Sequence, residues 1–121
     1  MIFLDRGKFL DAFAKASDQL DKKKLRKITR KSVDSINGSE ERGHHNLIIV
    51  MEELAELAQQ TSKAARGRCD KIGLTEEMAD VVLGLVYLQE ICGVSTLDLY
   101  KAVNVKVDRL ERVLNEKGVY L

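Results

Sequence analysis

Apolar residues recur along most of the chain at the three- and four-residue spacing that is typical of amphipathic helices. This pattern predicts a first helix over about residues 5–20 and a second over about 21–36. The sequence leaves open whether these two helices are continuous, bent or separated. Asn37-Gly38-Ser39 and Gly43 break the pattern, so residues 37–44 are expected to form a loop.

The second half of the chain predicts three more helices. The first runs from Asn46 to about Ala65, and a basic loop over 66–74 follows it. The next is expected over 75–92, with Thr75 as its N-cap, and the last over about 95–115, with Ser95 as its cap. The apolar run at 81–88 has the β propensity of a buried strand, but its register continues that of the preceding residues and favours a helix.

These elements indicate an all-α bundle of four or five helices. The absence of proline and the scarcity of aromatic residues agree with helices joined by short turns. A length of 121 residues suits one compact domain, in which residues 1–43 form an N-terminal basic helical segment and loop and residues 44–121 form the helical core.

Charge and cysteine content narrow the class of protein further. Residues 1–36 carry ten Lys/Arg against five Asp/Glu, whereas residues 37–121 carry ten against fourteen. Cys69 and Cys92 match neither a disulfide scaffold nor a zinc-finger spacing, and they fit a reducing compartment. The N-terminus lacks the pattern of a signal peptide, and no apolar run is long enough to span a bilayer. A soluble, cytoplasmic protein without a membrane partner is therefore expected.

Two pairs of acidic residues stand within the most apolar helices: Glu53 and Glu56 in MEELAEL, and Glu77 and Asp80 in TEEMAD. The i, i+3 spacing points each pair from one face of its helix. A single pair is ordinarily an exposed charged face, but two pairs on adjacent apolar helices need their charge compensated. A hard divalent cation compensates several carboxylates at once, and the lack of nearby His or Cys ligands favours Mg²⁺ or Mn²⁺ over zinc or iron.

The residues Glu52-Glu53-x-x-Glu56 followed by Glu77-x-x-Asp80 resemble the EExxE…ExxD signature of the all-α nucleoside triphosphate pyrophosphohydrolases. That superfamily includes MazG, the all-α dUTPases and phosphoribosyl-ATP pyrophosphatase. The resemblance extends over roughly 46–112, and residues 1–36 have no counterpart in it.

This resemblance implies a MazG-like bundle in which Glu53, Glu56, Glu77 and Asp80 bind Mg²⁺. Glu52 would be a further ligand or would orient the attacking water, so Glu52 and Glu53 are the candidate catalytic residues. The reaction implied is hydrolysis of a nucleoside triphosphate between the α and β phosphates, which gives the monophosphate and pyrophosphate. The family's sites are commonly completed across subunits, which implies a homodimer or homotetramer.

The resemblance also suggests residues that would bind the substrate. Lys101, Asn104, Lys106 and Arg109 are available to bind phosphate, although a solvated helix face explains each of them equally well. Asn46 is placed either to read a base edge or simply to cap its helix.

The run KKKLRKITRK, residues 22–31, supports an alternative function from another class. Seven basic residues in ten are typical of a helical nucleic-acid-binding module. However, aromatic residues for base stacking are lacking and no recognition motif is present, so nucleic acid is not the expected partner. A regulatory bundle without turnover is a further alternative, against which the intact set of four acids argues.

Overall fold

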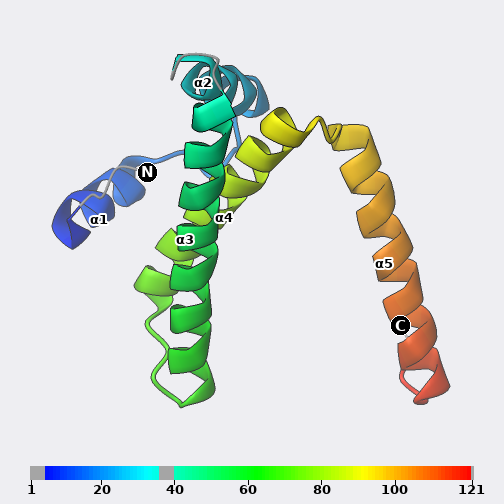
Figure 1. The fold of residues 1–121 in the computed structure, drawn as a ribbon. Coiled ribbons are helices and arrows are strands. Elements are labelled where there is room, and N and C mark those ends of the chain that lie inside the picture. The colour runs from blue at the N-terminus through cyan, green and yellow to red at the C-terminus, as the bar shows by residue number, and fades with distance from the viewer. Residues whose placement is uncertain (1–4, 36–39, 121) are drawn as a thin grey trace.

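The computed structural model describes residues 5–35 and 40–120, and within them it contains five helices and no strand (Figure 1). The predicted all-α fold is therefore confirmed for the described part of the chain. The helices are α1 (Arg6–Lys15), α2 (Lys22–Ser35), α3 (Glu40–Ala65), α4 (Lys71–Cys92) and α5 (Thr96–Glu116).

The first two helices are separate elements, which resolves a point that the sequence left open. Asp5 caps α1 by accepting a hydrogen bond from the backbone N–H of Lys8. The helix ends at Lys15, earlier than expected, and residues 16–21 are not helical. The side chain of Asp21 then accepts from the N–H of Lys24 at 3.0 Å and so starts α2.

The expected loop over 37–44 is wrong for residues 40–44, which belong to α3; residues 37–39 lie outside the described part of the chain. Asn46 consequently stands inside the helix instead of capping it. A glycine inside a helix costs only about 1 kcal/mol relative to alanine, and extending an existing helix is far easier than nucleating one. Gly43 alone is therefore too weak a breaker to end α3.

The start of α4 also differs from the prediction, because Asp70 caps this helix and Thr75 does not. Thr75 lies in the second turn, where its hydroxyl donates to the carbonyl of Lys71 at 2.7 Å. The other end was predicted correctly, since α4 stops at Gly93, which adopts a left-handed φ of 71°. Ser95 caps α5, also as expected, and residues 81–88 are helical.

The α3 and α4 helices form an antiparallel hairpin, which provides the main packing of the molecule (Figure 1). Gly84 on α4 lies directly against Val50 on α3, and both are buried. The α2 helix packs across the end of this hairpin, where the hydroxyls of Ser32 and Tyr87 are 2.9 Å apart. Because Gly84 has no side chain, the two helices approach closely along the stretch that carries the acids.

The α5 helix leaves the end of α4 and extends away from the hairpin (Figure 1). None of its residues is buried. No helix in the described segments is long and apolar enough to cross a membrane.

Candidate metal centre

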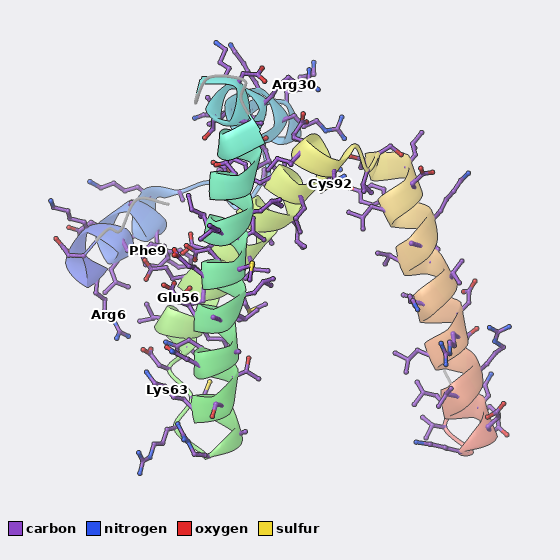
Figure 2. The ribbon with its side chains drawn as sticks, in the orientation of Figure 1. Arg6, Phe9, Arg30, Glu56, Lys63 and Cys92 are labelled. Carbon is purple, nitrogen blue, oxygen red and sulfur yellow. The ribbon has the colours of Figure 1, made fainter. Side chains whose placement is uncertain are left out.

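Three of the four predicted metal ligands meet across the α3–α4 hairpin. Glu53 and Glu56 from α3 and Glu77 from α4 each offer a carboxylate oxygen, and these oxygens lie within 4.8 Å of one another. Glu56 projects from the middle of α3 (Figure 2). Asp80 lies next to Glu53, close enough for their carboxyl groups to share a hydrogen bond. We call these four residues the acidic cluster.

The carboxylates of the acidic cluster lack the partners that buried acids require. Glu53 is only 4% exposed. One oxygen each of Glu53, Glu56 and Glu77 is shielded from solvent and accepts no hydrogen bond from the protein. Buried polar atoms are almost always paired, so these three oxygens on neighbouring side chains are available to bind a cation or another donor. An all-oxygen set of this kind fits Mg²⁺ or Mn²⁺.

The electrostatics of the acidic cluster favour protonation when no cation is present. Burial, followed by repulsion from Asp80 and Glu56, raises the pKa of Glu53 to about 7. Burial also raises the pKa of Glu77 to about 7, together with a hydrogen bond and repulsion from Glu56. The pKa of Asp80 is raised as well, mainly by burial. A bound cation would reverse this preference, because it stabilises the charged carboxylates.

The acids on α3 face the hairpin, whereas much of the apolar surface of the same helix faces outward. Met51 is 67% exposed and Leu54 is 45% exposed. An ordinary amphipathic helix would bury these residues and expose its glutamates. The orientation of α3 therefore places carboxylates inside the fold at the expense of apolar burial.

Two amide side chains extend the polar stripe of α3 on either side of Glu53. Asn46 and Gln60 each lie seven residues from Glu53, so all three share one face. Asn46 is 3% exposed and its amide nitrogen has no hydrogen-bond partner, and the amide oxygen of Gln60 is likewise buried without one. Sequence reasoning named Asn46 but missed Gln60, although its seven-residue spacing from Glu53 was a usable signal.

The remaining predicted site residues lie outside the acidic cluster. Glu52 is exposed on α3 and is not among the clustered carboxylates. Four further candidates are exposed on α5, which stands away from the hairpin in Figure 1. These are Lys101, Asn104, Lys106 and Arg109.

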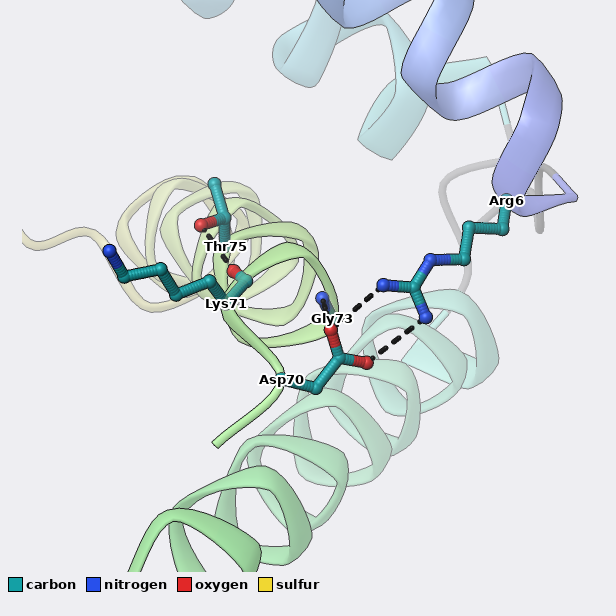
Figure 3. A network of polar contacts seen from close by, with 5 residues as sticks. All are labelled: Arg6, Asp70, Lys71, Gly73 and Thr75. Atoms are coloured by element: carbon teal, nitrogen blue, oxygen red, sulfur yellow. Dashed lines mark hydrogen bonds and ion pairs between the residues drawn. The ribbon is translucent and has the colours of Figure 1, made fainter. Parts of the chain in front are cut away.

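An ion pair that the sequence did not reveal ties α1 to the start of α4 (Figure 3). Arg6 donates from both terminal nitrogens to the carboxylate of Asp70, at 2.9 and 3.2 Å. The backbone N–H of Gly73 and then Arg6 lower the pKa of Asp70. This ion pair therefore links α1 to the first turn of the helix that carries Glu77 and Asp80.

Comparison of the chain with protein-family models, with curated proteins and with solved structures gives no match. Its chemistry must therefore be inferred from the acidic cluster and the residues around it.

Proposed function

We propose that the chain is a Mg²⁺-dependent hydrolase that cleaves a nucleoside triphosphate between its α and β phosphates. The observation that supports this most directly is the set of three buried carboxylate oxygens without partners, from Glu53, Glu56 and Glu77. The EExxE…ExxD pattern that carries them resembles that of the all-α pyrophosphohydrolases. Water adds across the α–β phosphoanhydride bond, and the products are the nucleoside monophosphate and pyrophosphate.

Within this proposal, Glu53, Glu56 and Glu77 hold Mg²⁺, and Mn²⁺ is the alternative ion. When bound, the ion would neutralise phosphate oxygens and activate a water molecule. Asp80 either binds the ion as a further ligand or holds the carboxyl group of Glu53 in place through their shared hydrogen bond. The burial of the acidic cluster strengthens its attraction for a cation, because water screens the charges less effectively there.

The amide side chains that flank Glu53 are suited to bind the base or the sugar of a nucleotide. Seven residues of helix span about 10 Å, so Asn46 and Gln60 lie on either side of the acidic cluster at nucleotide-scale distances. The unpaired nitrogen of Asn46 can donate to a base or sugar oxygen, and the unpaired oxygen of Gln60 can accept from an N–H or O–H group. Two sets of assignments remain predictions. One is Glu52 as a water-orienting residue, and the other is a set of phosphate ligands on α5: Lys101, Asn104, Lys106 and Arg109.

The test is a panel of ribonucleoside and deoxyribonucleoside triphosphates incubated with Mg²⁺ and assayed for both monophosphate and pyrophosphate. At least one substrate is expected to give the two products in equal amounts. The variants Glu53→Gln and Asp80→Asn are expected to lose activity by a factor of 100 or more, on the order of a lost metal or electrostatic contribution. Unchanged activity in both variants would contradict the proposal.

The alternative of a nucleic-acid-binding module has one observation in its favour. All seven basic side chains of 22–31 are exposed on α2, although Arg30 pairs with Glu90 and Arg26 donates to Thr96. If the panel shows no turnover while RNA or DNA binds with strong salt dependence, this alternative replaces the hydrolase proposal.

A further inference from the structure

One face of α4 meets α3 with residues that recur every three or four positions. Near one end of this face, Gly84 lies against Val50. Near the other end, a Cβ on Gly73 would lie 3.3 Å from the amide nitrogen of Gln60. The two acids that α4 contributes to the acidic cluster lie between these contacts. We call this face the α4 stripe: Asp70, Gly73, Glu77, Asp80 and Gly84.

The α4 stripe is strongly negative, and a bound nucleotide would add to its negative charge. Asp70 stands seven residues before Glu77, which is about 10 Å along the helix. A triphosphate carries more negative charge than one divalent ion neutralises, so sites that transfer phosphoryl groups add Arg or Lys side chains to the metal. Among the described residues, the cationic side chain that pairs with the α4 stripe is that of Arg6.

The ion pair between Arg6 and Asp70 can be given up at little cost to the fold. The two side chains are 57% and 35% exposed, and exposed pairs of this kind add little to stability. Asp70 also accepts from the backbone N–H of Gly73 at 3.2 Å, which is the largest single cause of its lowered pKa. Asp70 can therefore stay charged and keep capping α4 after Arg6 has left it.

The guanidinium of Arg6 is also the right shape for a phosphate. Its two terminal nitrogens point together at the carboxylate of Asp70, at 2.9 and 3.2 Å (Figure 3). Arginine makes the same two-point contact with phosphate oxygens as with a carboxylate. A phosphate that reaches the end of the α4 stripe can therefore replace Asp70 as the partner of Arg6.

We infer that Arg6 exchanges Asp70 for the β and γ phosphates of the bound triphosphate and so holds the pyrophosphate that leaves. The inference rests on the proposed hydrolysis and adds an orientation to it. The terminal phosphates lie toward Asp70, and the base and sugar lie toward Asn46, at the opposite end of the polar face of α3. Arg6 belongs to the segment that has no counterpart in the pyrophosphohydrolases that the chain resembles.

Calorimetric titration of the full chain with pyrophosphate in the presence of Mg²⁺ tests the inference. Arg6→Gln is expected to weaken pyrophosphate binding about tenfold to a hundredfold, because charged hydrogen bonds are lost. Asp70→Asn keeps a good N-cap and frees Arg6, so it is expected to leave pyrophosphate binding unchanged or to tighten it. Lys8→Gln removes the same charge from the exposed surface of α1 and is expected to have no effect.

The first two variants break the same ion pair, so their opposite effects separate ligand binding from a structural role. Equal losses in Arg6→Gln and Asp70→Asn would overturn the inference. Pyrophosphate binding that Arg6→Gln leaves unchanged would also overturn it.

The nucleoside monophosphate tests the orientation. Arg6→Gln is expected to bind this product as the wild-type chain does, because the product lacks the phosphates that Arg6 contacts; an equal loss for both products would contradict the orientation. Triphosphate cleavage that is as efficient in Arg6→Gln as in the wild-type chain would count against this inference alone. A wild-type chain that neither binds pyrophosphate nor cleaves any triphosphate would contradict the proposed function as well.

Discussion

Glu53 is the most deeply buried residue of the acidic cluster, and it lies beside two other acids of that cluster. Its carboxylate faces Asp80 and Glu56, and no cationic side chain pairs with it in the described residues. A buried carboxylate in this setting is stable only when it is protonated or bound to a cation. Low pH favours the protonated state and Mg²⁺ favours the cation-bound state, so both states can be studied by experiment.

The metal-free protein is expected to lose stability as the pH rises. Glu53 and Glu77 have pKa values of about 7 in the folded chain, against an ordinary glutamate pKa of 4.5. Between these limits the folded state binds more protons than the unfolded state, so the free energy of unfolding falls from about pH 4.5 through pH 7 and then levels off. Urea unfolding in EDTA across pH 5–8 measures this slope.

Glu53→Gln removes one of the titrating groups and is expected to flatten that slope. A metal-free stability that rises with pH between 5 and 7 would show that the acidic cluster is not desolvated as described.

Mg²⁺ is expected to stabilise the protein most above pH 7, where the carboxylates are already charged. At an ion concentration of a hundred times Kd, the gain in unfolding free energy is about 2.7 kcal/mol. Glu77→Gln is expected to abolish the increase in melting temperature. Glu52→Gln is the matched control, because Glu52 is a neighbouring glutamate that is exposed and outside the cluster. Equal responses of the two variants would contradict the assignment of ligands.

At the scale of single residues, the sequence predicted the site where acidic side chains also recur at a helical spacing. The i, i+3 pairs predicted the residues that meet, because each pair must leave one face of its helix. An amide in a helix has no distinctive pattern of its own, so Gln60 is marked in the sequence only by its seven-residue spacing from Glu53. The pair between Arg6 and Asp70 joins residues 64 positions apart, and nothing local to either residue indicates the other.

At the scale of elements, the close approach of α3 and α4 depends on Gly84. A Cβ at this position would lie 3.5 Å from Val50, which is an ordinary contact. Gly84→Ala is therefore expected to raise the free energy of unfolding by about 0.5–1 kcal/mol through helix propensity. Gly84→Leu is expected to lower it by about 1–3 kcal/mol through overpacking.

Urea unfolding of both Gly84 variants compares these effects. Since a leucine here separates the helices that carry the ligands, Gly84→Leu should also weaken the stabilisation by Mg²⁺. Destabilisation by alanine as large as that by leucine would mean that the helices are closer than described.

Helix boundaries show where local sequence signals compete. Asp70 and Thr75 are both acceptable N-caps, and Asp70 is used because its carboxylate accepts from the N–H of Gly73 and pairs with Arg6. The second partner comes from a different helix, so the sequence around α4 cannot decide between the two caps. Where signals agree, as at Gly93 and Ser95, the predicted boundaries are confirmed.

At the scale of the whole molecule, periodicity predicted helices but not the faces they would use. On α3 the apolar residues Met51 and Leu54 are exposed, while Glu53 and Glu56 face α4. A rule that buries apolar faces within one chain gives the opposite orientation. That rule fails here because acids, and not only apolar residues, occupy the contact between α3 and α4. No residue of α5 is buried, so its orientation could not be predicted from a buried face.

The most direct test of the central claim is a ³¹P NMR spectrum of the accepted triphosphate after incubation with the purified chain and Mg²⁺. We expect the three triphosphate signals to be replaced by those of a nucleoside monophosphate and pyrophosphate in equal amounts, and to persist with Glu53→Gln. Nucleoside diphosphate with inorganic phosphate, or equal turnover by the variant, would contradict the assignment of the acidic cluster to α–β cleavage.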